Sequence, residues 1–383
     1  MAPGDGIPVR KRRQDRWIQS RPPGTAERGL PRLSPGRLLV TVVAGIALVA
    51  GVVGVIGEVA DFSRLRDALS EMEPAWFAPA VVGKFGGYAG YILAYRSVAA
   101  MNDGPRLDLW TVTRIVAIGF GAVVAVSAPG GLAVDWWALH RAGCTVHDAL
   151  RRVLGFNTLQ WATLGAFAAL AGLTVVIGIG GSHVPLGMAL GWLVVVPLCV
   201  AGGLWASSPA RIERLSQAPP GRPLERLTLG AIARWAWRGL RVALADAIGG
   251  LAYVRPALRH PVRHRTGLLG YSLYWAGDML TLYACLRAFG ADLGIVALVL
   301  TYATAYVATA LPLPVGGAGG VDAAFTLTLT AVGIPLAPAL LIAVTYRGVS
   351  FWLPIIPALA LLPTVRRLAR DLRDIAGQGA PAT

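Results

Sequence analysis

The sequence is poor in charge, in lysine and in cysteine. Charged residues make up 14% of its 383 residues, against about 25% in a typical soluble domain, which excludes an ordinary soluble protein. The three cysteines, Cys144, Cys199 and Cys285, stand far apart, so neither a disulfide framework nor a paired-cysteine metal site is expected. The phosphate-binding pattern GxxxxGK(S/T) and the histidine spacings of metal sites are also missing. We therefore expect no metal, no cofactor and no ATPase activity of the P-loop type.

Hydrophobic residues, in contrast, make up 55% of the chain and form long apolar stretches. Several reach or approach the roughly 20 residues that cross a bilayer as a helix, and they lack the alternation of barrel strands. The stretches are Leu38–Val59, Pro79–Met101, Leu109–Ala128, Leu132–Arg141, Leu154–Ile179, Leu186–Ala206, Leu268–Ala288, Ile295–Leu311, Val321–Val332 and Pro338–Leu362. The pattern predicts an all-α polytopic membrane protein with about eight transmembrane segments.

The net charge of +15 comes from 33 arginines and two lysines, and the arginines flank the apolar stretches. This distribution is typical of membrane topology and not of nucleic-acid binding. It predicts three cytoplasmic segments: a disordered basic tail over 1–37, a loop over 207–265 and a tail over 366–383. The acidic loop Asp61–Glu73 is predicted to lie outside. In the long loop, Ala231–Leu244 has the pattern of an amphipathic helix on the cytoplasmic face of the cell membrane, or of a solvated linker helix.

Two glycine-rich breaks interrupt the apolar stretches, Pro129–Asp135 and Pro314–Asp322. A bilayer has no water for a freed backbone, so such breaks lie within protein or line a wet cavity. Each break is predicted to form either a re-entrant helical hairpin or two full crossings. Their glycines either present backbone N–H groups to an anion or allow close helix packing. The glycines concerned are Gly130, Gly131, Gly316 and Gly317.

The segments that follow the two breaks are similar at an offset of 190 residues. The pair Phe156-Asn157 aligns with Tyr346-Arg347, and Asp135 aligns with Asp322 when a three-residue gap is allowed. Charge at the segment ends predicts that the two units insert in opposite directions. An inverted repeat of this kind places a site near the midplane, where broken helices meet. Chance similarity between Ala-, Leu- and Gly-rich segments is the alternative.

Three basic residues are candidates for binding an anionic substrate: Arg347, Lys84 and Arg96. Arg347 lies about ten residues into the last apolar stretch, too deep to reach the headgroups easily, and its planar guanidinium suits phosphate. Lys84 is the only lysine within a predicted span. Arg96 follows twelve residues later, about 120° around the same helix, and is equally well interpreted as a positive-inside anchor.

Three acids lie within the apolar stretches: Asp135, Asp278 and Asp322. Carboxylates at this depth are functional candidates by default, because burying them in the bilayer is unfavourable. We interpret them as gating residues or as proton carriers that couple transport. The alternative is structural, with Arg347 in an ion pair with Asp322 or Asp278.

The second break and the residues after it resemble a known family. The residues that carry the resemblance are Gly316-Gly317-Ala318-Gly319-Gly320-Val321-Asp322, Gly333-Ile334-Pro335 and Tyr346-Arg347. They are similar to the flippase-like transmembrane domain of lysylphosphatidylglycerol synthases, whose signature is GGxGxxE, a Gly-apolar-Pro and an arginine in the last helix. The resemblance covers residues 38 to 365 and implies a stand-alone membrane domain without the synthase domain. Asp322 replaces the usual glutamate, and Asn157 stands where the first half of the family has arginine.

These observations favour a lipid flippase or lipid-binding transporter over an enzyme. The expected substrate is an anionic or zwitterionic phospholipid or a polyprenyl-phosphate-linked sugar. Two other functions remain open. One is a membrane-embedded transferase on lipid-linked substrates, with one of the three acids as general base. The other is an accessory scaffold that partners a cell-envelope glycosyltransferase or another enzyme of envelope biosynthesis.

Overall fold

The structure is a computed structural model. It describes residues 62–126, 128–179, 184–208, 248–257, 259–260, 262, 264–310 and 317–378, together with residues 43, 47, 51 and 54. The predictions for the basic tail, for most of the first span and for the amphipathic helix Ala231–Leu244 lie outside the described residues, as does Gly316.

The described secondary structure is helical, which confirms the predicted fold class at that level. The helices are α3 (Phe62–Ser70), α4 (Phe77–Ala99), α5 (Leu109–Val126), α6 (Ala128–Arg141), α7 (Val146–Val176), α8 (Leu186–Ala206), α11 (Arg265–Ala288), α12 (Ile295–Tyr306), α13 (Gly320–Ala331), α14 (Leu336–Arg347), α15 (Ile355–Leu361) and α16 (Val365–Gln378). A π-helical turn (Gly348–Trp352) separates α14 from α15.

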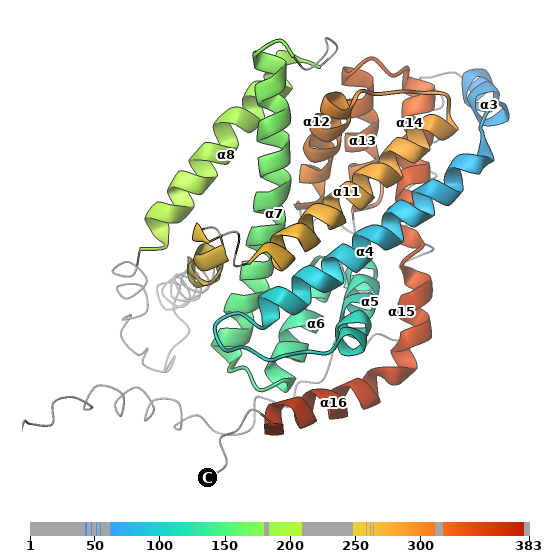
Figure 1. Cartoon of the computed structure of the whole chain (residues 1–383). Helices are drawn as coiled ribbons and strands as arrows, with labels where there is room; N and C mark the ends of the chain where they lie inside the picture. Colours follow the sequence, from blue (N-terminus) through green and yellow to red (C-terminus); the bar gives the residue numbers. More distant parts are fainter. Residues whose placement is uncertain are drawn as a thin grey trace, which may run out of the picture. The chain divides into compact units, whose positions relative to one another are not determined.

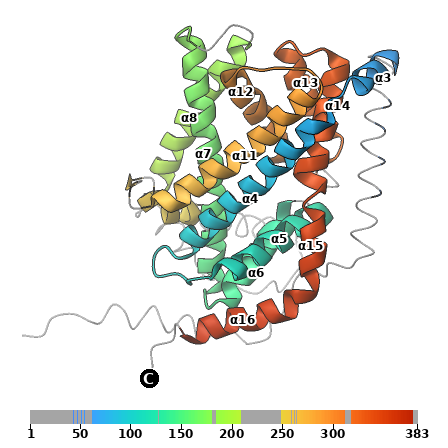
Figure 2. The same ribbon diagram turned by 45° about the vertical axis from the view of Figure 1, so that its right-hand side comes forward.

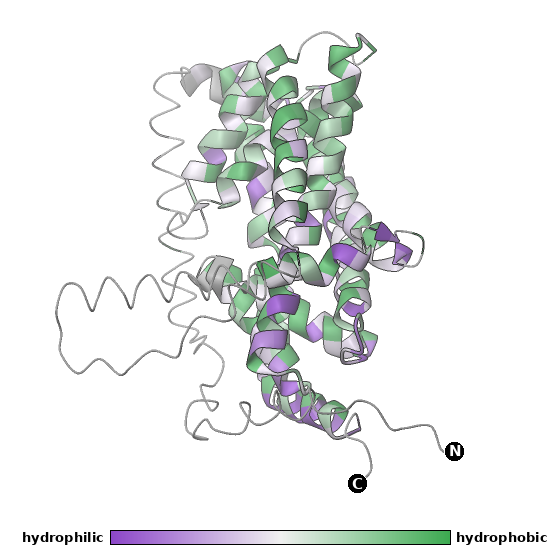
Figure 3. Cartoon of the chain, turned by 90° about the vertical axis from the view of Figure 1, so that its left-hand side faces the viewer, coloured by the Kyte–Doolittle hydropathy of each residue, from purple (hydrophilic) through white to green (hydrophobic). Residues whose placement is uncertain are grey.

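The long helices consist mainly of hydrophobic residues, whereas hydrophilic residues are more frequent toward the lower end of the view in Figure 3. Three helical segments in the described chain are long and apolar enough to cross a membrane: Val146–Val176, Leu186–Ala206 and Leu336–Gln378. Within α8 only Ala189 is buried, and leucines such as Leu198 are exposed. An apolar surface of this extent is stable only against lipid or another protein. The chain is a multi-pass membrane protein.

Helices α4 and α11 lie side by side and form the centre of the described chain (Figure 1). Their contacts run in opposite directions along the sequence, since Gly83 of α4 meets Gly277 of α11 while Gly90 meets Gly270. The two helices are therefore antiparallel. The glycines carry no Cβ, which lets the two backbones approach closely. This close approach determines which side chains of α4 and α11 can meet.

We predict that Gly277→Ala destabilises the protein by about 1–3 kcal/mol through overpacking. A Cβ built on Gly277 would lie 2.6 Å from the backbone nitrogen of Gly87 and closer still to the Gly83 carbonyl oxygen, neither of which can rotate away. Gly86→Ala is the control on α4, because a Cβ there meets nothing within 4 Å. Thermal unfolding in detergent compares the two variants. Equal melting temperatures would contradict the close-packed interface.

Two helical pairs surround this centre (Figures 1 and 2). Helix α5 packs on α6, and α12 packs on α13. The pairs are linked reciprocally: α7, which follows the first pair, contacts α12, while α15, which comes after the second pair, contacts α5.

Some element bounds differ from those predicted. Helix α6 begins at Ala128, so the Pro-Gly-Gly sequence forms its first turn instead of a break before it. Proline suits this place because the first turn has no partner for its missing N–H. The predicted loop Asp61–Glu73 contains α3, and the predicted C-terminal tail contains α16, which packs on α5 and α6 (Figure 2). The predicted helix Pro338–Leu362 is interrupted by the π-helical turn.

Candidate functional site

The first charged centre joins α4 to α11 through Lys84 and Asp278. The Lys84 Nζ atom lies 2.6 Å from Asp278 Oδ1, and the two residues are 4% and 2% exposed. Both belong to the antiparallel α4–α11 pair, whose glycines flank them at Gly83 and Gly277. Since an unpaired charge is very unfavourable in this surrounding, each residue neutralises the other. The sequence had predicted both residues as candidates but had not predicted the pair.

Tyrosines complete this centre. The hydroxyl groups of Tyr302 and Tyr346 donate hydrogen bonds to Asp278 Oδ2, at 2.5 and 2.8 Å. The Lys84 ammonium lies 5.0 Å from the centre of the Tyr88 ring, a cation–π contact. Asp278 thus accepts hydrogen bonds from α12 and α14 as well as from α4. One carboxylate links four helices.

The second charged centre is the pair Arg347–Asp322. Arg347 Nε lies 3.3 Å from Asp322 Oδ1, and the two residues are 5% and 0% exposed. The backbone N–H of Gly319 donates to Asp322 Oδ2 at 2.8 Å, so the same acid caps the N-terminus of α13. Gly319 has a φ of 81°, a conformation that favours glycine. The glycine break therefore positions the acid that holds Arg347, and this pair is the structural alternative that the sequence left open.

Arg347 also stands at the end of α14, where the helix changes to the π-helical turn (Gly348–Trp352). Its guanidinium lies 4.2 Å from the centre of the Phe351 ring. The N–H of Leu353 bonds to the carbonyl of Gly348, five residues earlier, where an α-helix would use the residue four earlier. Such π-helical turns are frequent at functional sites.

Asp135 is the third acid, and its surroundings differ. It lies two turns into α6, is 7% exposed and accepts no hydrogen bond or ion pair from the described residues. The hydroxyl groups of Tyr91 and Tyr95 on α4 and of Tyr271 on α11 lie within electrostatic range of it. Asp278 and Asp322 each have a cation, whereas Asp135 has none in the part of the chain that is described.

The remaining predicted residues lie away from these centres. Arg96 is exposed near the end of α4, and its Nε donates to the carbonyl of Leu107 at 3.1 Å. Twelve residues of helix separate it from Lys84, roughly 18 Å along the axis. In α6, Gly130 and Gly131 are buried, and a Cβ built on Gly131 would lie 2.7 Å from Val123 Cγ2 of α5. This contact fits the second of the two predicted roles for these glycines, close helix packing. Gly317 has a φ of 82° and belongs to the turn before α13.

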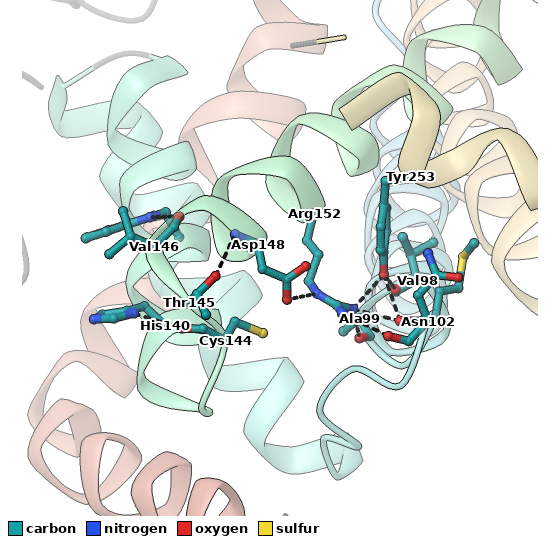
Figure 4. Close-up of polar contacts among 12 residues, drawn as sticks. Val98, Ala99, Asn102, His140, Cys144, Thr145, Val146, Asp148, Arg152 and Tyr253 are labelled. Carbon is teal, nitrogen blue, oxygen red and sulfur yellow. Dashed lines mark hydrogen bonds and ion pairs between the residues drawn. The ribbon is translucent and has the colours of Figure 1, made fainter. Parts of the chain in front are cut away.

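A further buried cation, Arg152 of α7, lies in a separate cluster (Figure 4). Its guanidinium donates to the carbonyls of Ala99 and Met101, each at 2.8 Å, and to Asp148 Oδ2 at 2.8 Å. It also donates to the hydroxyl of Tyr253 at 2.7 Å, and that hydroxyl donates in turn to the carbonyl of Val98. These contacts satisfy the carbonyls at the C-terminus of α4, so we interpret the cluster as structural.

Cys144 lies beside the same cluster, in the turn between α6 and α7 (Figure 4). Burial raises the pKa of its thiol to about 11, although Arg152 lowers it slightly. The thiol is therefore protonated at neutral pH and is a poor nucleophile. Among the described residues, no group of histidine, cysteine and acidic side chains has the arrangement of a metal site.

The sequence profile of one family matches the chain over residues 42–358, and its description is "Lysylphosphatidylglycerol synthase TM region". The chain belongs to this family. The match confirms the suspected resemblance, and the family's name relates the protein to membrane phospholipid. No curated protein matches the sequence.

In this lysylphosphatidylglycerol synthase TM region, the structure places two tyrosines at the first charged centre that the sequence had not indicated as site residues. Tyr302 was not predicted, because a single tyrosine in an apolar helix is indistinguishable from a packing residue. Tyr346 belonged to a quoted motif but had no role assigned to it. Asn157, which the sequence alignment at an offset of 190 pairs with Arg347, donates from Nδ2 to the carbonyl of Val153 in its own helix.

Proposed function

We propose that the protein moves a phosphate-bearing lipid across the cell membrane, and that Arg347 and Lys84 recognise the phosphate. The observation that carries this proposal is the burial of two ion pairs inside a membrane domain whose family is named after a phospholipid synthase. Ionised side chains at such depth are rare and mark substrate pathways. The substrate class is a phospholipid or a polyprenyl-phosphate-linked sugar, since both present the same charged group.

The pairs also suggest how a substrate exchanges with the protein. In the described conformation Asp278 holds Lys84, and Asp322 holds Arg347. A phosphate that enters replaces a carboxylate as the partner of each cation. Arginine suits this exchange because its fork donates two parallel hydrogen bonds to phosphate oxygens. Release of Asp278 also frees two tyrosine hydroxyl groups, so substrate binding loosens the contact between helices. Asp278 and Asp322 would thus act as the gate.

We also propose that the two halves of the chain form an inverted repeat, an arrangement that is compatible with alternating access. Its support is the antiparallel α4–α11 pair together with the reciprocal contacts α7–α12 and α15–α5. Helices α12 and α13 have 12 residues each, about 18 Å at 1.5 Å per residue, against a hydrocarbon core of roughly 30 Å. This length supports a re-entrant hairpin at the second break. The arginine-rich segments at 207–265 and on α16 support cytoplasmic termini.

The test is lipid movement in vesicles reconstituted with the purified full chain. The paired variant Arg347→Gln/Asp322→Asn removes both charges together, so that neither is left buried alone. We expect the rate of movement of a labelled phospholipid to fall about tenfold or more, which corresponds to a lost charged hydrogen bond. The control is Arg287→Gln/Asp292→Asn, an exposed ion pair at 3.3 Å. Movement at the wild-type rate in both variants would remove Arg347 from the mechanism.

A further inference from the structure

Asp135 differs from Asp278 and Asp322 because no ion pair joins it to a cation of the described residues. The helices that pack on α6 are α5, α7 and α16. Two cations of these helices are held by other acids: Arg114 of α5 lies 2.6 Å from Asp371 of α16, and Arg152 of α7 lies 2.8 Å from Asp148. On α4 and α11 the groups near Asp135 are the tyrosines at positions 91, 95 and 271, which are neutral.

The proposed repeat, in which Asp135 corresponds to Asp322, offers a direct comparison. In the second half, Asp322 lies in the first turn of α13, where Arg347 and the N–H of Gly319 stabilise its charge. In the first half, Asn157 replaces the arginine. In addition, α6 begins at Ala128, so that Asp135 lies beyond the free N–H groups of the first turn. Both stabilising features of Asp322 are therefore missing at Asp135.

An ionised carboxylate in an apolar interior without a partner is strongly unfavourable, and in practice such a group becomes neutral. Binding of one proton is the simplest way to make the carboxyl group neutral. A metal cation would need several ligands, and the described residues contain no group of three or more histidine, cysteine or acidic side chains that could hold one. The neighbouring hydroxyl of Tyr95 is itself buried without a hydrogen-bond partner among the described residues. Asp135 of α6 and Tyr95 of α4 are thus two buried polar side chains without a hydrogen-bond partner that the described residues supply.

We infer that Asp135 is the proton-binding site of the protein: it is neutral in the described conformation and releases its proton when a conformational change brings it to water. Asp278 and Asp322, in contrast, are joined to Lys84 and Arg347 in ion pairs. The coupling of this proton to lipid movement rests on the proposed function. The binding of the proton does not, because it follows from the surroundings of Asp135 alone.

Infrared spectroscopy of the purified full chain tests the binding of the proton. A protonated carboxyl group has a C=O stretch that an ionised carboxylate lacks. We expect this band at neutral pH in the wild type and in Asp374→Asn, which removes an exposed acid of α16. Asp135→Asn should lose the band, while Asp135→Glu should keep it at a shifted frequency, which also shows that the site tolerates substitution. A wild type without the band, or Asp135→Asn with the full band, would overturn the inference.

A second measurement tests the coupling. Movement of a labelled phospholipid is compared in vesicles with and without a proton gradient. We expect the gradient to change the wild-type rate and to have no effect on Asp135→Asn. An equal response of the two proteins would overturn the coupling. If no protein moves lipid under either condition, the proposed function fails, and the infrared result still decides whether Asp135 binds a proton.

Discussion

Asp278→Asn is expected to destabilise the protein by about 3–5 kcal/mol, the usual effect of removing one partner from a buried ion pair. The amide leaves the Lys84 ammonium, 4% exposed, without an anion. It also weakens the hydrogen bonds that Tyr302 and Tyr346 now make to a charged oxygen. Because these contacts come from α4, α12 and α14, the loss should affect the whole domain. Unfolding of the purified protein in detergent measures the change.

The double variant Lys84→Met/Asp278→Asn separates charge from packing. It removes both charges together, and the amide oxygen still accepts a tyrosine hydrogen bond, so we expect most of the lost stability to return. The exposed pair Arg287–Asp292 provides the matched control, for which the same double-mutant cycle should give a coupling of about 0–1 kcal/mol. A double variant of Lys84 and Asp278 that is no more stable than Asp278→Asn would mean that the ion pair does not account for the effect.

The sequence identified the two charged residues of this centre but neither its tyrosines nor their arrangement. Lys84 and Asp278 attract attention because each is a lone charge in an apolar stretch. Their contact spans 194 residues, and no local periodicity reports a contact of that range. It depends on the direction in which α4 and α11 cross, and that direction follows from glycines spread over both helices. Once the antiparallel glycine contacts are known, the meeting of Lys84 and Asp278 is a geometric consequence.

At the two glycine breaks, the sequence indicated which residues matter but not exactly where each helix begins. At the second break the prediction was close, because Gly319 adopts a positive φ and α13 starts within one residue of the predicted place. At the first break the helix begins four residues before Leu132, since Pro129 and the glycines can occupy a first helical turn. The shift places Asp135 two turns into α6, and it decides whether the acid is capped. Propensity alone does not distinguish these two outcomes, because tertiary packing of α6 on α5 selects between them.

Arg152→Met is expected to destabilise the protein by several kcal/mol, since hydrogen bonds to charged groups contribute about 1.5–3 kcal/mol each. The guanidinium is 3% exposed, and its donors reach two helices and the turn at Asn102. That turn needs support, because Asn102 has a φ of 50° and Asp103 a φ of 56°. Such left-handed conformations persist in non-glycine residues only where the surroundings stabilise them. Thermal unfolding in detergent gives the total loss.

Hydrogen exchange distinguishes a local loss of the hydrogen bonds around Asn102 from a general effect of removing a positive charge. In Arg152→Met, the amides of residues 101–104 should exchange faster than in the wild type even well below the melting temperature, because the carbonyls around them have lost their donor. Arg152→Lys should recover only part of the stability, since one ammonium cannot span the acceptors that a planar fork reaches. Arg373→Met, on the exposed face of α16, should change stability by no more than about 0.5 kcal/mol. If Arg152→Lys matched the wild type in both measurements, positive charge alone would suffice at this position, and the geometry in Figure 4 would not be what holds the turn.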